Sequence, residues 1–310
     1  MWNLNKPTKS THIYVRQRLQ SKCDRIALGE IGSPYNLSQP DKLCTPLVLS
    51  SPHSGRLYPK AFQSQSLLSL RQLRQSEDCY IDQLLAPLCG LGIPLLAANF
   101  PRIIVDVNRD AHEWPPQISA SDRSQPITQR ARLGFGVVPT RIGQHVDIYP
   151  HDISANLIEH RLKTLYHPYH GALLNLLQTA KSKFGHAVLL DCHSMPGSDL
   201  NGDKRADIVL GDRYGTACRP DTIAFIENVF TGLGYKTTRN QPYAGGFITA
   251  HYGRPNLNIE AVQIEINKDL YLDPLSLERH VGWDELAANM QKAIVRISEY
   301  FTVSEGIAAQ

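Results

Sequence analysis

An apolar run of residues precedes each of three side chains that can bind a metal ion or move a proton: His53, His193 and Glu265. In an open parallel α/β sheet, buried strands are continuous runs of Val, Ile and Leu, and ligands bind at the carboxyl ends of those strands. Residues that lie far apart in sequence can therefore share one crevice at that edge of the sheet. This layout indicates a catalytic site and favours a metallohydrolase.

Two acidic residues could complete a metal site with the histidines. Glu77 and Asp78 follow Ser76, a plausible N-cap, at the point where a helix is expected to begin. A carboxylate there can complete a His–carboxylate–His zinc site that keeps one position open for water. The helix macrodipole also favours acids in a first turn without any metal. The residues alone leave both interpretations open.

Glu265 lies between Ile264 and Ile266 in a strand that is predicted to be buried on both faces. An unpaired buried carboxylate is costly, and burial raises its pKa towards the range of a general base. We therefore expect Glu265 to deprotonate a metal-bound water. The alternative is a carboxylate that points to a solvated face.

Arg109 is predicted to bind a substrate carboxylate, because its planar guanidinium can donate two parallel hydrogen bonds. Asn108 provides a neutral donor beside it, and Arg102 is a further candidate for the same role. A structural salt bridge between Arg109 and a neighbouring aspartate is the alternative. The polar, glycine-rich segment 245–253 could supply a lid or an oxyanion donor, and His251 within it is a further substrate-site candidate.

Strands and helices are expected to alternate along the chain. The predicted strands are 47–51, 93–99, 103–107, 187–191, 207–211 and 261–266, and the predicted helices are 67–89 with a break near Ser76, 156–184 with a kink or split at Pro168 and an end at Gly185, 221–233 and 283–301. This alternation predicts an α/β protein with a mostly parallel sheet that is covered on both faces.

A single domain is expected over residues 41–303, preceded by a polar N-terminal arm (1–40) and followed by a short tail (304–310). The segment 111–151 is rich in Pro, Gly, Arg and polar residues, and it is predicted to be a long loop. Loops of that length without periodicity are unusual and often functional.

Composition narrows the class of protein. The 310 residues carry a net charge of +3, and the scattered basic residues argue against a nucleic-acid or membrane-surface partner. No run approaches the ~20 apolar residues of a membrane span, and the basic stretch 9–25 lacks the apolar core of a signal peptide. The six cysteines are dispersed without paired spacing, which is typical of reduced thiols in the cytoplasm.

Six stretches, taken in order and spacing, resemble the N-formylglutamate amidohydrolase family from about Ser33 to Tyr271. They are Ser51-Pro-His-Ser-Gly, Glu77-Asp-Cys-Tyr-Ile-Asp-Gln-Leu, Asp106-Val-Asn-Arg-Asp, Asp191-Cys-His-Ser-Met-Pro, Gly245-Gly-Phe-Ile-Thr-Ala-His-Tyr-Gly and Gln263-Ile-Glu-Ile-Asn. The resemblance implies a three-layer sandwich with a mixed, mostly parallel sheet, similar to the zinc carboxypeptidases (phosphorylase/hydrolase-like). It also implies that His53 and His193 bind the metal and Glu265 is the base. Asp78 is the better match to the family's acidic ligand, although Glu77 fits peptidase chemistry equally well.

The resemblance implies zinc-dependent hydrolysis of an N-formyl or short N-acyl amino acid, with one divalent ion as cofactor. The simplest substrate is N-formyl-L-glutamate, which gives formate and glutamate, as in histidine catabolism. One alternative is a carboxypeptidase-like or cell-wall peptide amidase activity on the same metal. Another is a binding protein that keeps the fold without catalysis.

Overall fold

A seven-stranded sheet forms the centre of the computed structural model, which describes residues 9–116, 118, 127–143 and 146–303. The strand order is β1-β3-β2-β6-β9-β7-β8. The strands are β1 (Tyr35–Ser38), β2 (Leu47–Ser51), β3 (Leu95–Ala98), β6 (Ala187–Met195), β7 (Ile208–Gly211), β8 (Thr237–Arg239) and β9 (Ile259–Asn267). β3, β2, β6 and β9 are parallel to one another, whereas β1 and β7 are antiparallel to their inner neighbours and β8 is parallel to β7. The predicted mixed, mostly parallel sheet is confirmed.

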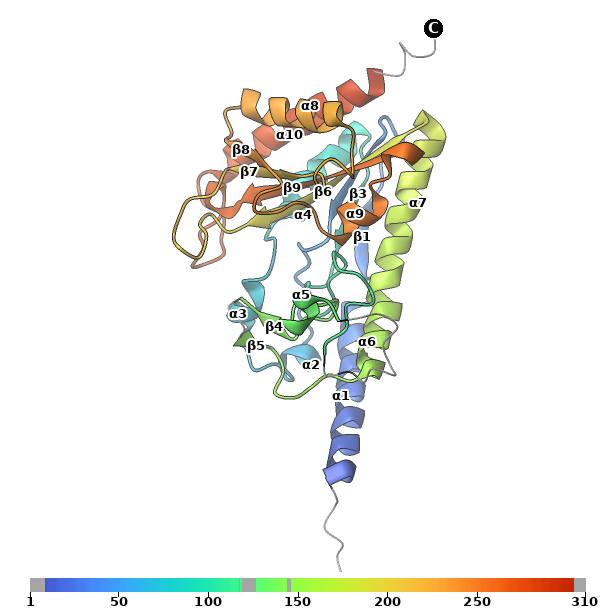
Figure 1. Ribbon diagram of the computed structural model, residues 1–310, viewed down its shortest axis with the longest axis vertical. Helices are drawn as coiled ribbons and strands as arrows, with labels where there is room; N and C mark the ends of the chain where they lie inside the picture. Colours follow the sequence, from blue (N-terminus) through green and yellow to red (C-terminus); the bar gives the residue numbers. More distant parts are fainter. Residues whose placement is uncertain (1–8, 117, 119–126, 144–145, 304–310) are drawn as a thin grey trace, which may run out of the picture.

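Helices cover both faces of the sheet and make three layers (Figure 1). The helices are α1 (Lys9–Ile31), α2 (Lys60–Gln63), α3 (Leu70–Arg74), α4 (Ile81–Leu85), α5 (Gln129–Arg132), α6 (Ala155–Arg161), α7 (His167–Phe184), α8 (Pro220–Gly232), α9 (Phe247–Tyr252) and α10 (Trp283–Val303), with short 3₁₀ turns at Ala86–Leu91, Pro255–Leu257 and Lys268–Leu270. Alternate residues of a strand point to opposite faces. Val48 therefore packs in the layer of α7, while Leu47 and Leu49 pack in the layer of α4, α8 and α10.

The predicted long helix 156–184 is divided in the way that its proline indicates. α6 leads through a π-helical turn (Leu162–Tyr166) into α7, whose second residue is Pro168. Proline offers no N–H to the helical ladder and crowds the preceding turn, which explains the irregular segment at this point. Gly185 ends α7 in the left-handed conformation (φ 78°), as predicted.

Two local predictions are wrong. Ser76 does not cap a helix: its hydroxyl donates to the Leu73 carbonyl, and Ser69 caps α3 through a capping box. The apolar run 103–107 is buried but forms turns rather than a strand. Its backbone hydrogen bonds come from a local turn and a distant loop, since Ile104 N donates to the carbonyl of Pro101 and Asp106 N donates to that of Val137. Burial alone therefore made this run resemble a core strand.

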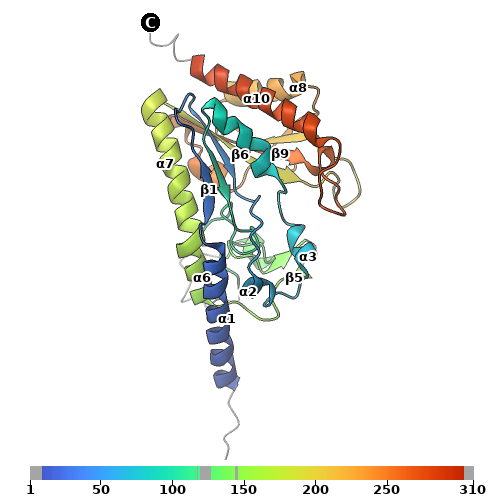
Figure 2. The ribbon, with the colours of Figure 1, turned by 180° about the vertical axis from the view of Figure 1, so that it is seen from behind.

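The segment 1–40 is not a plain polar arm. From Lys9 to Ile31 it forms α1, which lies beside α6 and extends beyond it at the end of the molecule opposite α10 (Figures 1 and 2). Ala27, Leu28 and Ile31 are buried in the core, and β1 joins the edge of the sheet. The predicted tail 304–310 lies outside the described residues.

The predicted loop 111–151 contains little regular structure in its described part. It holds α5 and a small hairpin of β4 (Arg141–Ile142) and β5 (Val146–Asp147). No helix among the described residues is long and apolar enough to cross a membrane. All six cysteines are free thiols.

A buried ion pair attaches α1 to α6. Arg161 and Asp24 are each 1% exposed, and the Arg161 guanidinium donates to Asp24 Oδ1 at 2.7 Å. The same guanidinium donates to the Ile104 carbonyl at 2.8 Å and to the Tyr149 hydroxyl at 2.7 Å. The pair therefore connects the N-terminal helix to the segment that leads to Asp106.

We predict that Asp24→Ala lowers the free energy of unfolding by about 3–5 kcal/mol, because it leaves the Arg161 charge buried without its counterion. Urea denaturation followed by circular dichroism measures this change. Glu30→Ala is the control on the same helix, since Glu30 is exposed and accepts one hydrogen bond from Lys60 N. Equal, small effects of both variants would show that the buried pair does not hold α1.

Candidate metal centre

The register of β6 and β9 places the polar side chains of the site next to one another. Asp191 is paired with Gln263 and His193 with Glu265. Because side chains alternate along a strand, these four residues share one face of the sheet at its carboxyl end. Earlier in β6 the same face is apolar, with Leu189 in the core of the α7 layer. The change from apolar to polar along one face marks the site.

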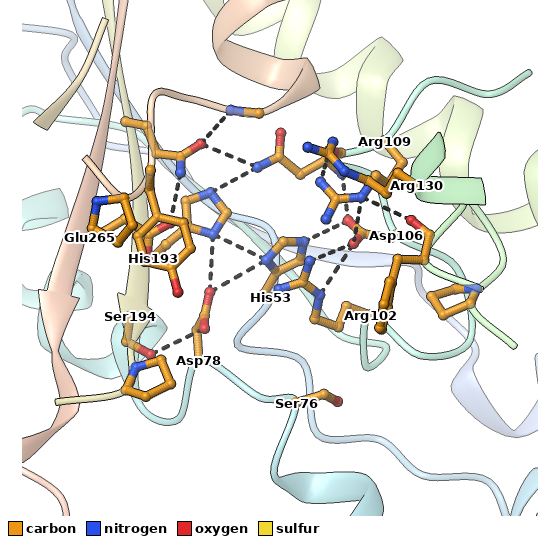
Figure 3. Close-up of a pocket in the computed structure, with 18 of the residues that line it drawn as sticks. His53, Ser76, Asp78, Arg102, Asp106, Arg109, Arg130, His193, Ser194 and Glu265 are labelled. Atoms are coloured by element: carbon orange, nitrogen blue, oxygen red, sulfur yellow. Dashed lines mark hydrogen bonds and ion pairs between the residues drawn. The ribbon is translucent and has the colours of Figure 1, made fainter. Parts of the chain in front are cut away.

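Three potential metal ligands converge from separate parts of the chain (Figure 3). His53 follows β2, Asp78 lies in the turn between α3 and α4, and His193 lies on β6. Asp78 Oδ2 is 3.0 Å from His193 Nδ1 and 3.4 Å from His53 Nδ1, and the two Nδ1 atoms are 3.1 Å apart. All three residues are buried.

This donor set fits a divalent metal ion. A tetrahedral zinc ion bound at about 2.0–2.1 Å by nitrogen and oxygen holds its ligand atoms about 3.3 Å apart, close to the separations found here. Two histidines and one carboxylate are a ligand set of catalytic zinc sites, which keep a fourth position for water or substrate. The residues are therefore suited to hold such an ion.

Each histidine is oriented by a carboxylate on its other ring nitrogen. His53 Nε2 is 2.7 Å from Asp106 Oδ1, and His193 Nε2 is 2.9 Å from Asp191 Oδ2. Such pairs keep a proton on Nε2, so Nδ1 is the nitrogen that can bind a metal once its own proton is lost. Ser50 donates to the other oxygen of Asp191 at 2.8 Å. Neither aspartate was predicted to belong to the site, although the Asp-x-His spacing on a strand puts Asp191 on the same face as His193.

The hydrogen bonds around Glu77 and Asp78 favour Asp78 as the acidic metal ligand. Glu77 accepts hydrogen bonds from Arg74 and from the Cys79 thiol, and it does not belong to the converging group. Asp78 N donates to the His53 carbonyl at 3.0 Å, and Ser194 Oγ donates to Asp78 Oδ1 at 3.1 Å. Asp78 is thereby held with one oxygen turned to the histidines.

The charges at the centre suit a cation. Burial acts to raise the pKa of Asp78, but hydrogen bonds from His193 and His53 hold it well below its usual value. Burial acts to lower the pKa of His193, but the charge of Asp191 raises it well above its usual value. Asp78 is therefore ionised at neutral pH, and a metal ion has to displace a proton from His193. Metal binding should weaken as the pH falls.

Glu265 lies beside the converging group without belonging to it. Burial raises the pKa of Glu265 to about 7, and the charge of Asp78 adds to the rise against those of His193 and Arg102. Gln263 Nε2 donates to Glu265 Oε1 at 2.7 Å, while Gln263 Oε1 accepts from Gly246 N at 2.7 Å. Gln263 therefore fixes the orientation of the carboxylate, a role that the sequence analysis did not assign.

The metal centre opens into a cavity of about 650 Å³. Its lining includes the three ligands, Glu265 and many cationic side chains: Arg102, Arg109, Arg130, Arg141, Arg213 and Lys268. The sheet edge supplies one side of the cavity and the 102–109 and 130–143 segments supply another. A cavity with this charge is suited to a small anionic ligand.

Arg102 and Arg109, the two arginines predicted to bind a substrate carboxylate, differ in their hydrogen-bond partners. Arg102 is bound to Asp106 Oδ2 at 2.6 Å, so it supports the carboxylate that orients His53. Arg109 donates Nε and Nη1 to backbone carbonyls of Phe135 and Asn108 and lies 3.9 Å from Asp106. Burial lowers the pKa of Arg109 to about 10, against the attraction of Asp106, and Arg102 and Arg130 add to the lowering. A bound anion would relieve this excess of positive charge.

Of the other two predicted substrate-site residues, Asn108 lines the cavity and His251 does not. Asn108 Oδ1 accepts from Ile248 N at 2.8 Å, and its Nδ2 is 3.4 Å from Gln263 Oε1, so Asn108 joins the cavity lining to the start of α9. His251 is exposed on α9 and stacks on Phe247, and it is not among the residues that line the cavity. Within the segment 245–253, Gly245 and Gly246 line the cavity and residues 247–252 form α9, so His251 is not placed at the candidate site.

Comparisons with known proteins agree on one family. The sequence model of the family described as N-formylglutamate amidohydrolase matches residues 45–272. N-formylglutamate deformylase of Pseudomonas putida is 28% identical over 74% of this chain and 82% of the relative. The crystal structure of N-formylglutamate amidohydrolase from Ralstonia eutropha JMP134 superposes with a TM-score of 0.81 at 32% identity, over 88% of this chain and 99% of that one.

We predict that Asp191→Asn weakens zinc binding roughly 10- to 100-fold, because an amide no longer fixes the Nε2–H form of His193. Competition with a chromogenic chelator measures the affinity. Asp212→Asn is the control, since Asp212 is also a buried carboxylate but lies outside the centre. The assignment is contradicted if both variants bind zinc as tightly as the wild type does.

Proposed function

The chain belongs to the N-formylglutamate amidohydrolase family, and from that premise we propose that it is a zinc-dependent enzyme that hydrolyses N-formyl-L-glutamate to formate and L-glutamate. One observation carries the proposal: three buried ligand atoms lie 3.0–3.4 Å apart next to a buried carboxylate on the adjoining strand. Family membership supplies the substrate, since the curated relatives are named for it.

In this proposal His53, Asp78 and His193 hold one zinc ion. When bound, such an ion lowers the pKa of a water and polarises the formyl carbonyl. Asp106 and Asp191 keep the two imidazoles in the tautomer that presents Nδ1. The buried position of the three ligands excludes bulk water from all but the cavity side.

Glu265 is the general base. Its carboxylate accepts a proton from the attacking water and returns it to the nitrogen of the leaving amine. Gln263 holds Glu265 Oε1, so in this proposal the other carboxylate oxygen takes the proton. A raised pKa makes the carboxylate a stronger base than an exposed glutamate, which suits both proton transfers.

Arg109 binds the substrate carboxylate nearer to the formyl group, the α-carboxylate. It lines the cavity, its side chain is 17% exposed, and Asp106 links it to the ligand His53. Arg130 lies beside it and adds positive charge to the same wall (Figure 3). Asn108 keeps this wall in place through its bonds to α9 and Gln263.

The activity is tested by measuring formate released from N-formyl-L-glutamate by the zinc-loaded protein. N-acetyl-L-glutamate, assayed for released glutamate, is the control for acyl size, and a hydrophobic N-formyl amino acid is the control for charge. We expect the highest kcat/KM for N-formyl-L-glutamate. No formate release from it by protein that holds one equivalent of zinc would overturn the proposed function.

Glu265→Gln should lower kcat by ~10²–10⁴-fold, because the amide keeps the shape but cannot take a proton. Zinc content should remain one equivalent. Unchanged activity in the variant would place the base elsewhere.

In the wild type, kcat/KM should rise with pH through the pKa of Glu265, since its ionised form is the active one. That pKa should lie below about 7 when zinc is bound, because the ion favours the carboxylate.

Arg109→Lys should raise KM for N-formyl-L-glutamate about 10- to 100-fold, because an ammonium cannot replace a bidentate guanidinium. The loss should be far smaller for N-formyl-L-isoglutamine, whose α-carboxylate is amidated. The comparison requires kcat and KM for both compounds and the melting temperature of the variant. Equal losses with a lower melting temperature would instead identify Arg109 as purely structural.

A further inference from the structure

A second wall of the cavity is formed by two loops that adjoin β7 and α9. Residues 213–214 follow β7, and residues 242–246 precede α9, and both groups line the cavity. The loops touch closely: a Cβ added to Gly211 would lie 2.6 Å from Gly245 N. Arg213 N donates to the Ala244 carbonyl at 2.8 Å. This wall therefore has a fixed shape.

Two consecutive residues of this wall have strained backbones. Arg213 and Tyr214 both have φ 57°, a left-handed conformation that non-glycine residues rarely adopt. Asn240 holds this turn, since its Oδ1 accepts from Asp212 N and Tyr214 N and its Nδ2 donates to Asp212 Oδ1 at 2.7 Å. Strain that is held in place in this way is found where a side chain has to be presented to a ligand.

Most N–H groups of the Arg213 guanidinium have no hydrogen-bond partner among the described residues. Within the described residues its one polar contact is Nη1 to the Gly245 carbonyl at 3.1 Å. Among the other cations of the lining, Arg102 is bound to Asp106 and Arg141 to Asp147, Lys268 donates to the Glu77 carbonyl, and Arg130 lies beside Arg109 (Figure 3). Arg213 is thus a cation of the lining that lacks an acidic partner among the described residues.

We propose that Arg213 is a specificity residue that binds the γ-carboxylate of the substrate, which rests on the proposed function. N-formylglutamate has two carboxylates, and the α-carboxylate lies nearer to the formyl group. The Arg109 side chain is 17% exposed, whereas Arg213 is exposed and adjoins Tyr214, which is 72% exposed, so Arg213 lies nearer to solvent at the mouth of the cavity. A substrate with its formyl group at the metal centre extends its side-chain carboxylate towards the mouth. Arg109 and Arg213 then hold the two carboxylates from different walls.

The test compares N-formyl-L-glutamate with N-formyl-L-glutamine, in which only the γ-carboxylate is amidated. Arg213→Ala should lower kcat/KM for the glutamate compound roughly 10- to 100-fold, mainly through KM, and change that for the glutamine compound less than about threefold. Arg71→Ala is the matched control: Arg71 is also exposed and donates to one backbone carbonyl, that of Leu275, but it does not line the cavity. It should leave both values unchanged.

A second variant separates recognition from backbone effects. Arg213→Gly should lose the same preference for the γ-carboxylate, yet melt at a higher temperature than Arg213→Ala, because glycine adopts positive φ without strain. If Arg213→Ala lowers kcat/KM equally for both compounds, or for neither, the assignment of Arg213 is wrong while the proposed function stands. If the wild-type enzyme releases formate from neither compound, the proposed function fails and the assignment fails with it.

Discussion

The parallel pairing of β6 with β9 is the constraint on which the site depends. It places His193 beside Glu265 and Asp191 beside Gln263, so the proposed ligand, its orienting carboxylate, the proposed base and the residue that holds that base arise from one register. A shift of one residue in either strand would turn these side chains into the opposite apolar layer. The nine-residue strands are almost entirely buried, and their apolar stretches fix that register. The chemistry is thus positioned by hydrophobic burial.

Burying so many polar groups at one edge of the sheet is costly unless each is paired. The structure pairs them in chains: Ser50 with Asp191, Asp191 with His193, and Arg102 with Asp106 and His53. The chains end at Nδ1 atoms and one Asp78 oxygen that face one another. A cation at that point satisfies all three at once, which joins the stability of the network to the proposed catalytic function. The cationic cavity beyond it is suited to an anionic ligand.

Much of the fold could be predicted, because apolar runs such as Leu47–Ser51 and the Pro168 and Gly185 signals have local causes. Helix α1 was not predicted because its sequence lacks a strong apolar periodicity, and its attachment depends on the distant Arg161. The apolar runs before His53 and His193 indicated a shared site, the family resemblance favoured Asp78 as the acidic ligand, and the three side chains do converge in space. Asp106, Gln263 and Arg213 were not assigned, because their roles come from partners that only the tertiary structure brings together.

The central claim is that the His53–Asp78–His193 centre holds the one ion on which hydrolysis depends. It is tested most directly by stripping the protein with a chelator and adding zinc back in fractions of an equivalent while formate release from N-formyl-L-glutamate is measured. The account predicts a rate that starts near zero, rises linearly and levels off at one equivalent, with no recovery in His53→Ala. A stripped protein that releases formate at the full rate, or a His53→Ala variant that recovers with zinc, would contradict it.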